Sequence, residues 1–105
     1  MTLQAFEQIL KAACPQTYEL GAEPRASRCV VWHRFGVQSG HGDNRNLFDL
    51  PKLQVDILCK SPTDELVDDV CGALSSHSLP YSVQDYMVYD PDYEQLRTIL
   101  QLVVV

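Results

Sequence analysis

The stretch Lys52–Leu74 constrains the fold most, because a strand pattern, a sharp stop and a helix pattern follow one another in it. Apolar and polar residues alternate over Lys52–Lys60, which is typical of a strand with one buried face. Ser61 can cap a helix and Pro62 suits a first helical position, so a helix is predicted to begin there. One side of that helix is apolar, through residues spaced by four: Leu66, Val70 and Leu74. This side can be buried only against the preceding strand, which indicates a helix packed on a sheet.

Length and charge limit the classes of protein that the chain can belong to. Its 105 residues, 46% of them hydrophobic, fit one globular domain. Eight basic residues against fourteen acidic ones give a net charge of −6. Wrapping nucleic acid or binding an anionic membrane needs a basic surface, so both are disfavoured. No apolar run approaches the roughly 18 residues of a membrane helix, and no signal peptide is recognisable. We expect a single domain, residues 1–105, made in a cytoplasm-like compartment and kept there or carried onward by assembly.

The first third of the chain predicts one helix and one or two strands. Leu3–Ala13 has the spacing of an amphipathic helix, with Thr2 as its N-cap and Pro15 ending it. Thr17–Leu20 is at most a short strand. Cys29–Trp32 is apolar on both faces, which predicts a strand covered on one face by helices and on the other by more of the chain or by a partner subunit.

The middle and end of the chain differ in regularity. Gly36–Leu50 is rich in glycine, asparagine and aspartate, which predicts a long loop that is either functional or mobile. Pro51 is then expected at a strand edge or a bulge. Tyr81–Tyr89 alternates like a strand, and Asp90–Asp92 has the composition of a turn. Glu94–Val105 fits either a helix or a strand, and its terminal valines favour a strand that closes a hairpin.

These elements predict an α+β fold, in the order α-β-β-α-β-β. We expect a mainly antiparallel sheet of about four strands with two helices packed on one face, because only the connection through the second helix is long enough for a parallel crossover.

No residue pattern predicts catalysis, a cofactor or a metal site. The four cysteines show no C-x-x-C pair and are interpreted as buried thiols: Cys14, Cys29, Cys59 and Cys71. His41, Asp43 and Asp49 lack calcium-loop spacing and are interpreted as solvated loop residues. Cys29 and His33 share a strand face among apolar neighbours, which favours packing over a nucleophile pair. The chain is therefore not expected to be an enzyme.

Two surface clusters leave their interpretation open. Four tyrosines near the last hairpin indicate either a sheet face or a protein interface: Tyr81, Tyr86, Tyr89 and Tyr93. Four acidic residues line the second helix and are either a solvated face or an electrostatic lining within an assembly: Asp64, Glu65, Asp68 and Asp69.

The order of motifs along nearly the whole chain has a known counterpart. The motifs begin with a short N-terminal helix (Leu3–Ala13), a strand ending in an aromatic residue (Cys29–Trp32) and a polar loop (Gly40–Arg45). An alternating strand (Leu53–Lys60) and a helix opened by Pro62 follow. The last motif is a Leu-Pro-Tyr entry (Leu79–Tyr81) to a tyrosine-rich hairpin. In this order the chain resembles the tail-completion proteins (tail terminators, head–tail joining proteins) of long-tailed bacteriophages and prophages.

The resemblance implies a structural role without catalytic residues. Such proteins close into a ring, usually of six, which caps the tail tube, stops its growth and offers a surface to the head-completion or connector protein. Double-stranded DNA only passes through the lumen, and an acidic protein suits that passage. The implied location is the virion neck, after synthesis in the bacterial host cytoplasm, with no membrane contact.

The same reading gives candidate contact residues in the loop and in the last hairpin: Ser39, His41, Asp43, Asn44, Arg45, Tyr86 and Tyr89. The apolar end Leu102–Val105 and the second face of Val30–Trp32 are expected to supply a further contact patch.

Other classes of function stay open from the sequence. One is a different neck, head-closure or tube-like virion protein, for which tube formation by the purified protein would be diagnostic. Another is a small host α+β domain that binds a ligand or regulates, since one fold serves many functions. An enzyme or metalloprotein is the last, and bound zinc would reveal it.

Overall fold

A computed structural model describes residues 1–21, 28–42 and 45–104, with the backbone alone for 38–42 and 45–49. It contains two helices and one five-stranded sheet of order β1-β2-β3-β5-β4. The elements are α1 (Leu3–Ala13), β1 (Thr17–Glu19), β2 (Cys29–Gly42), β3 (Arg45–Cys59), α2 (Leu66–Ser76), β4 (Tyr81–Asp90) and β5 (Gln95–Val103). The α+β class and the mostly antiparallel pairing are thus confirmed.

The sheet has one strand more than expected, and it is mixed. β1 pairs parallel to β2, with Thr17 opposite Val30 and Glu19 opposite Trp32. The expectation that only the second helix could serve a parallel crossover was wrong. β1 has only three residues, so the chain needs to travel back only about 10 Å before β2 begins. The connection from residue 20 to residue 28 is long enough for that return.

The expected loop Gly36–Leu50 is instead the outer half of a β-hairpin formed by β2 and β3. The two strands stay in register from Gly36 opposite Lys52 to Gly42 opposite Arg45, with irregularities at Arg34/Gly36 and Gly40/His41. Glycine lowers the intrinsic strand preference, but strand formation depends more on pairing than on propensity. Pro51 lies within β3, close to the first irregularity, and its carbonyl accepts the N–H of Val104 at 3.1 Å.

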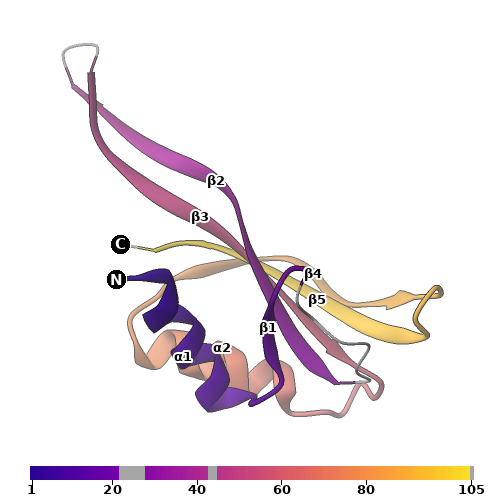
Figure 1. The fold of residues 1–105 in the computed structure, drawn as a ribbon. Coiled ribbons are helices and arrows are strands. Elements are labelled where there is room, and N and C mark those ends of the chain that lie inside the picture. Colours follow the sequence, from indigo (N-terminus) through magenta and orange to yellow (C-terminus); the bar gives the residue numbers. More distant parts are fainter. Residues whose placement is uncertain (22–27, 43–44, 105) are drawn as a thin grey trace.

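Both helices cover the same face of the sheet, as predicted (Figure 1). α1 is capped as expected, because the Thr2 hydroxyl accepts the N–H of Ala5 at 3.0 Å. Phe6 meets Trp32 edge to face, with ring centroids 6.0 Å apart. The apolar side of α2 is buried as predicted, through Leu66, Val70 and Leu74.

Helix α2 begins at Leu66, four positions after the predicted start at Pro62. Ser61 caps a turn instead of the helix: its carbonyl accepts the N–H of Asp64 at 3.1 Å and its hydroxyl that of Thr63 at 3.2 Å. The N-cap residue is Glu65, whose side chain makes no capping bond, and Asp64 just before it accepts the N–H of Leu66 on Oδ1 at 3.0 Å. The helix therefore starts where a side chain can satisfy its first donor.

The chain ends in a strand, which confirms the favoured reading of Glu94–Val105. β5 lies inside the sheet, so Leu100 faces Val55 on one neighbour and Val83 on the other. This placement overturns the expected contact patch at Leu102 and Val104, which are buried, whereas Val103 is half-buried and Val105 lies outside the described residues. The second face of Val30–Trp32 is not an exposed contact patch either, since Val31 is only 4% exposed.

The molecule is elongated, with extents of 50 × 26 × 23 Å. Two hairpins account for this shape, because β2–β3 and β4–β5 project away from the helices in different directions (Figure 1). Among the described residues, no helix is long and apolar enough to cross a membrane.

Candidate functional site

The outer part of the β2–β3 hairpin, residues 34–52, is here called the arm. The last residue of β2 that pairs with β1 is Trp32, and β5 reaches β3 only as far as Lys52. Beyond those positions the strand pairings of β2 and β3 are with each other. The β2 strand of the arm runs from Gly36 to Gly42 past its base, which at about 3.3 Å per residue is about 23 Å. The arm is thus a two-stranded ribbon that extends beyond the layer covered by helices.

The base of the arm carries a small cluster of aromatic and basic side chains. The ring of Phe35 lies edge to face with His33, with centroids 6.5 Å apart, and Lys52 Nζ is 5.4 Å from the Phe35 centroid. Phe35 and Val37 are each 41% exposed. Phe35 is the extra residue at the irregularity between Arg34 and Gly36. The irregularity therefore places an aromatic ring and a cation together on the open face of the arm.

The β4–β5 hairpin, residues 81–103, is here called the terminal hairpin. It exposes five apolar or aromatic side chains, each at least 49% accessible: Val83, Tyr86, Val88, Tyr89 and Tyr93. β4 is the outer strand of the sheet. Val88 pairs with Arg97 and Tyr89 with Leu96, so these two neighbouring side chains lie on opposite faces of the hairpin. The exposed apolar groups therefore border the outer strand on both of its faces, and exposed apolar groups gathered in this way are typical of contact surfaces.

The backbone of β4 is irregular where this surface lies. Its register with β5 shifts between Val83 and Asp85 and again between Asp85 and Val88. Met87 has a φ of +48°, and its N–H is bonded to the Thr98 hydroxyl at 3.0 Å. Such bulges re-aim side chains and interrupt regular pairing along an edge strand.

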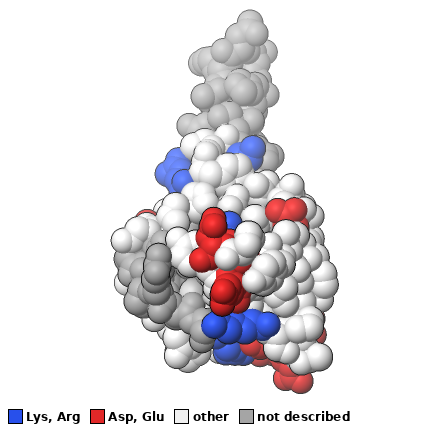
Figure 2. Space-filling model, turned by 90° about the vertical axis from the view of Figure 1, so that its right-hand side faces the viewer, with Lys and Arg blue, Asp and Glu red and all other residues white. Residues whose placement is uncertain are grey.

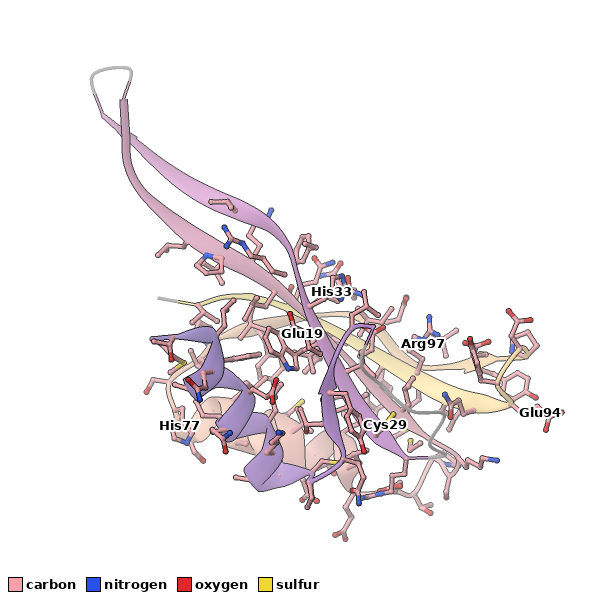
Figure 3. The ribbon with its side chains drawn as sticks, viewed as in Figure 1. Glu19, Cys29, His33, His77, Glu94 and Arg97 are labelled. Carbon is pink, nitrogen blue, oxygen red and sulfur yellow. The ribbon has the colours of Figure 1, made fainter. Side chains whose placement is uncertain are left out.

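Acidic groups surround the end of the terminal hairpin. Asp90 accepts a hydrogen bond from Arg97 Nη2 at 2.8 Å and from the N–H of Asp92 at 3.0 Å, which closes the turn. Arg97 Nε is buried and has no hydrogen-bond partner. In Figure 3, Arg97 lies partway along the hairpin and Glu94 at its turn. This hairpin therefore carries one cation among four acidic residues, and Asp90 is the carboxylate that pairs with Arg97.

Basic side chains mark the base of the arm instead. Figure 2 shows basic groups below the grey projection and acidic groups further down on the same face. The pairing register puts Arg34 and Lys52 at this level, and neither position has an acidic neighbour among the described side chains 34–37 and 50–52. The two hairpins therefore differ in the sign of their charge.

A bidentate ion pair fixes the segment before β2 to the start of α2. Arg28 Nε lies 2.9 Å from Asp64 Oδ2, and Arg28 Nη2 lies 3.1 Å from Asp64 Oδ1. The guanidinium lowers the pKa of Asp64 below its ordinary value, and the carboxylate raises the pKa of Arg28. This pair stabilises the body of the molecule, meaning the two helices and the part of the sheet that they cover, from which both hairpins project.

The cysteines behave as packed thiols. Cys14, Cys29 and Cys59 are buried, and Cys71 is half-buried. Burial raises the pKa of Cys59, which keeps its thiol protonated, with Sγ 3.6 Å from the Ser61 carbonyl oxygen. Across residues 1–21, 28–42 and 45–104, no three His, Cys, Asp or Glu side chains are grouped as metal ligands.

A shallow hollow lies beside the end of α2. It is open to solvent, has a volume of about 420 Å³ and is lined by Ser75, Ser78, Leu79, Pro80 and Tyr81. The Cys71 thiol and burial raise the pKa of Tyr81. Its hydroxyl is therefore protonated at neutral pH.

The residues predicted as contact sites fall on the two hairpins. Tyr86 and Tyr89 are exposed on the terminal hairpin, at 61% and 58%. The backbones of Ser39, His41 and Arg45 belong to the arm, but their side chains lie outside the described part of the chain. Asp43 and Asn44 lie outside the described residues altogether. Because the hairpins point in different directions, the two groups are not brought together within one copy (Figure 1).

Sequence reasoning missed the cluster at the base of the arm. The signal was a period of two, with Phe35 and Val37 on one strand and Phe48 and Leu50 on the other. The glycines between these residues favour a loop and mask this alternation.

Comparisons with known proteins give no further guidance, because no family model, curated protein or solved structure matches the chain.

Proposed function

We propose that this chain is a structural subunit of a long-tailed phage or prophage, a tail terminator that closes as a ring on the tail tube and joins the tail to the head. The observation that carries the proposal is the arm. An isolated two-stranded ribbon is only marginally stable in water, and three strands or a packed partner are normally needed. An arm with Phe35 and Val37 half exposed gains most when it lies against another molecule.

The resemblance described above gives this assembly role its context. Its proposed partners are further copies of the chain, the tail-tube protein and the head-completion or connector protein. A net charge of −6 suits a ring through which DNA passes without being held. The proposed location is the virion neck, after synthesis in the host cytoplasm.

The decisive experiment combines native mass with tube growth. The purified protein is measured over a wide concentration range by mass and by negative-stain imaging, and is then added to growing tubes of the tail-tube subunit. We expect rings with a central hole, in solution or on tube ends, and tubes that stop lengthening. A protein that forms no ring in either setting and leaves tube length unchanged would contradict the proposal.

A matched pair of variants separates an effect of the arm from a folding defect. The double substitution Phe35→Ser, Val37→Ser removes the exposed apolar groups of the arm base, whereas Leu20→Ser removes an exposed apolar side chain, 54% accessible, that lies outside both hairpins. We expect the first to lose ring formation or tube capping while its circular dichroism stays unchanged, and the second to retain more of both activities.

A tube-like or neck subunit is the second candidate, because an arm of this kind serves stacked rings as well as a single ring. Long tubes formed by the purified protein alone would favour that alternative.

A further inference from the structure

We propose that the base of the arm of one copy packs head to tail on the terminal hairpin of a second copy. The contact joins Arg34, Phe35, Val37 and Lys52 to the surface around Tyr86, Val88 and Tyr89. This inference rests on the proposed function in one respect, namely that the chain assembles with itself, and it names the two surfaces that meet.

Both surfaces are apolar and lie outside the part of the sheet covered by helices. Phe35 and Val37 are 41% exposed, and Tyr86, Val88 and Tyr89 are more than half exposed. Tyrosine is favoured at protein interfaces because its ring supplies area and its hydroxyl a hydrogen bond. The cation of Lys52, already 5.4 Å from one aromatic centroid, is placed to meet further aromatic rings.

Opposite charges select a second copy as the occupant. Residues 34–52 contain three basic and two acidic side chains, a net charge of +1. Residues 81–103 contain four acidic side chains and one basic one, a net charge of −3. The single cation there, Arg97, is engaged by Asp90 at 2.8 Å. Surfaces of opposite sign steer association and set its register.

The contact must be made between copies. The arm and the terminal hairpin project in different directions, so they do not meet within one molecule (Figure 1). A contact between two different surfaces is heterologous, and repetition of it produces a closed ring or an open helix. The bulges around Asp85 and Met87 interrupt regular pairing at the outer edge of β4. Side-chain packing, and not addition of a strand, is therefore the mode of contact.

Charge reversal with mixing tests the contact. The arm variant carries Arg34→Glu and Lys52→Glu, and the hairpin variant carries Asp85→Lys and Asp92→Lys. Association is followed by sedimentation velocity at low salt. Each variant alone sets like charges against each other, so we expect its association to weaken by about tenfold or more. An equimolar mixture restores opposite charges at every contact, so the mixture should associate as the unchanged protein does.

Two control variants carry single charge reversals of the same kind outside both hairpins. The first is Lys60→Glu, at the residue that follows β3, and the second is Asp68→Lys, at a residue of α2. Both should associate like the unchanged protein, and their mixture should show no gain. Restoration in the mixed sample also excludes misfolding as the reason for weak association of the separate variants.

Several outcomes would overturn the contact: an unchanged protein that is monomeric at every concentration and forms no ring on tube ends, a mixture that stays dissociated, or control variants that weaken association equally. Reversed variants that still self-associate but no longer stop tube growth would show that the arm meets the tube protein instead. Conversely, rings that follow the charge pattern but never stop tube growth would uphold the contact and refute the terminator function.

Discussion

The two hairpins differ in what holds them in place. The terminal hairpin is anchored along its whole length, because β5 lies between β3 and β4 and buries Leu100 and Leu102 in the core. The arm is anchored only at its base, through β5 and the cluster of Phe35 and Lys52. The core therefore determines the position of the terminal hairpin, whereas the arm depends on whatever it contacts. In an assembly subunit, this pairs a fixed receptor surface with an adaptable projection.

The largest effect should follow from a cavity under the terminal hairpin. Leu100 is fully buried, so Leu100→Ala should lower the free energy of unfolding by about 2–5 kcal/mol. Its cross-strand neighbour Val83 is 51% exposed, and Val83→Ala should change stability by less than about 0.5 kcal/mol. Urea denaturation of both variants measures the difference. Equal effects at the two positions would mean that the core does not anchor this hairpin.

A smaller effect should come from the bulge in β4. The Thr98 hydroxyl, which is buried, accepts the N–H of Met87 at 3.0 Å. Thr98→Val leaves that donor without its partner, at a cost of about 1–2 kcal/mol in unfolding free energy. Thr98→Ser retains the hydroxyl and should recover the hydrogen bond, which hydrogen exchange at Met87 can report. Fast exchange at Met87 in the unchanged protein would argue against the bond.

Acid should weaken the body that supports both hairpins. Arg28 holds the pKa of Asp64 below its ordinary 3.8. The pair therefore contributes fully above that pH, and its contribution is lost as the pH falls through the lowered pKa. We expect at most about 1 kcal/mol, because the pair is partly exposed. Unfolding at pH 7 and pH 3 should differ less in Asp64→Asn than in the unchanged protein. An identical pH dependence in both would remove this pair from the account.

The smallest effect is expected in the arm. A Cβ added at Gly36 would lie 3.8 Å from Lys52 Cδ, which is an ordinary van der Waals contact. Gly36→Ala should therefore change the unfolding free energy by less than about 1 kcal/mol, and a gain is possible because alanine restricts the unfolded chain. Thermal unfolding tests this expectation. A large loss of stability would show that the base of the arm is packed as tightly as the core.

The same contrast explains how much the sequence predicted. Burial on one face produces strict alternation, so the strand around Val55 and the helix containing Val70 were recognisable. The segment around Leu100 fitted a helix as well as a strand, and only its terminal valines favoured the strand. The described residues of the arm, 34–37 and 50–52, are exposed or half-buried. The strands of the arm are specified mainly by pairing with each other, which a local pattern does not record. The parallel pairing of Thr17 with Val30 was missed for a related reason, because a three-residue strand carries almost no pattern.

The sequence pointed to one of the two surfaces of the candidate site and missed the other. Tyr86 and Tyr89 were identified because exposed aromatic residues near a turn stand out in a sequence. Phe35 and Val37 were not, because their exposure depends on how far β2 extends past its neighbours. That length is a property of the whole sheet, because it depends on where β1 and β5 end. A local stretch of sequence therefore does not predict it.

The interior position of β5 also affects the order of events during synthesis. Lys52 pairs with Val103 and Leu53 with Leu102, so β3 is synthesised well before its partner strand β5. Pairings between residues this distant in sequence are slow to form. The terminal hairpin is held in its final position only once β5 has paired with β3, so the surface that we propose as a receptor is fixed late in folding. Nascent subunits would then be unable to recruit one another before their cores have closed.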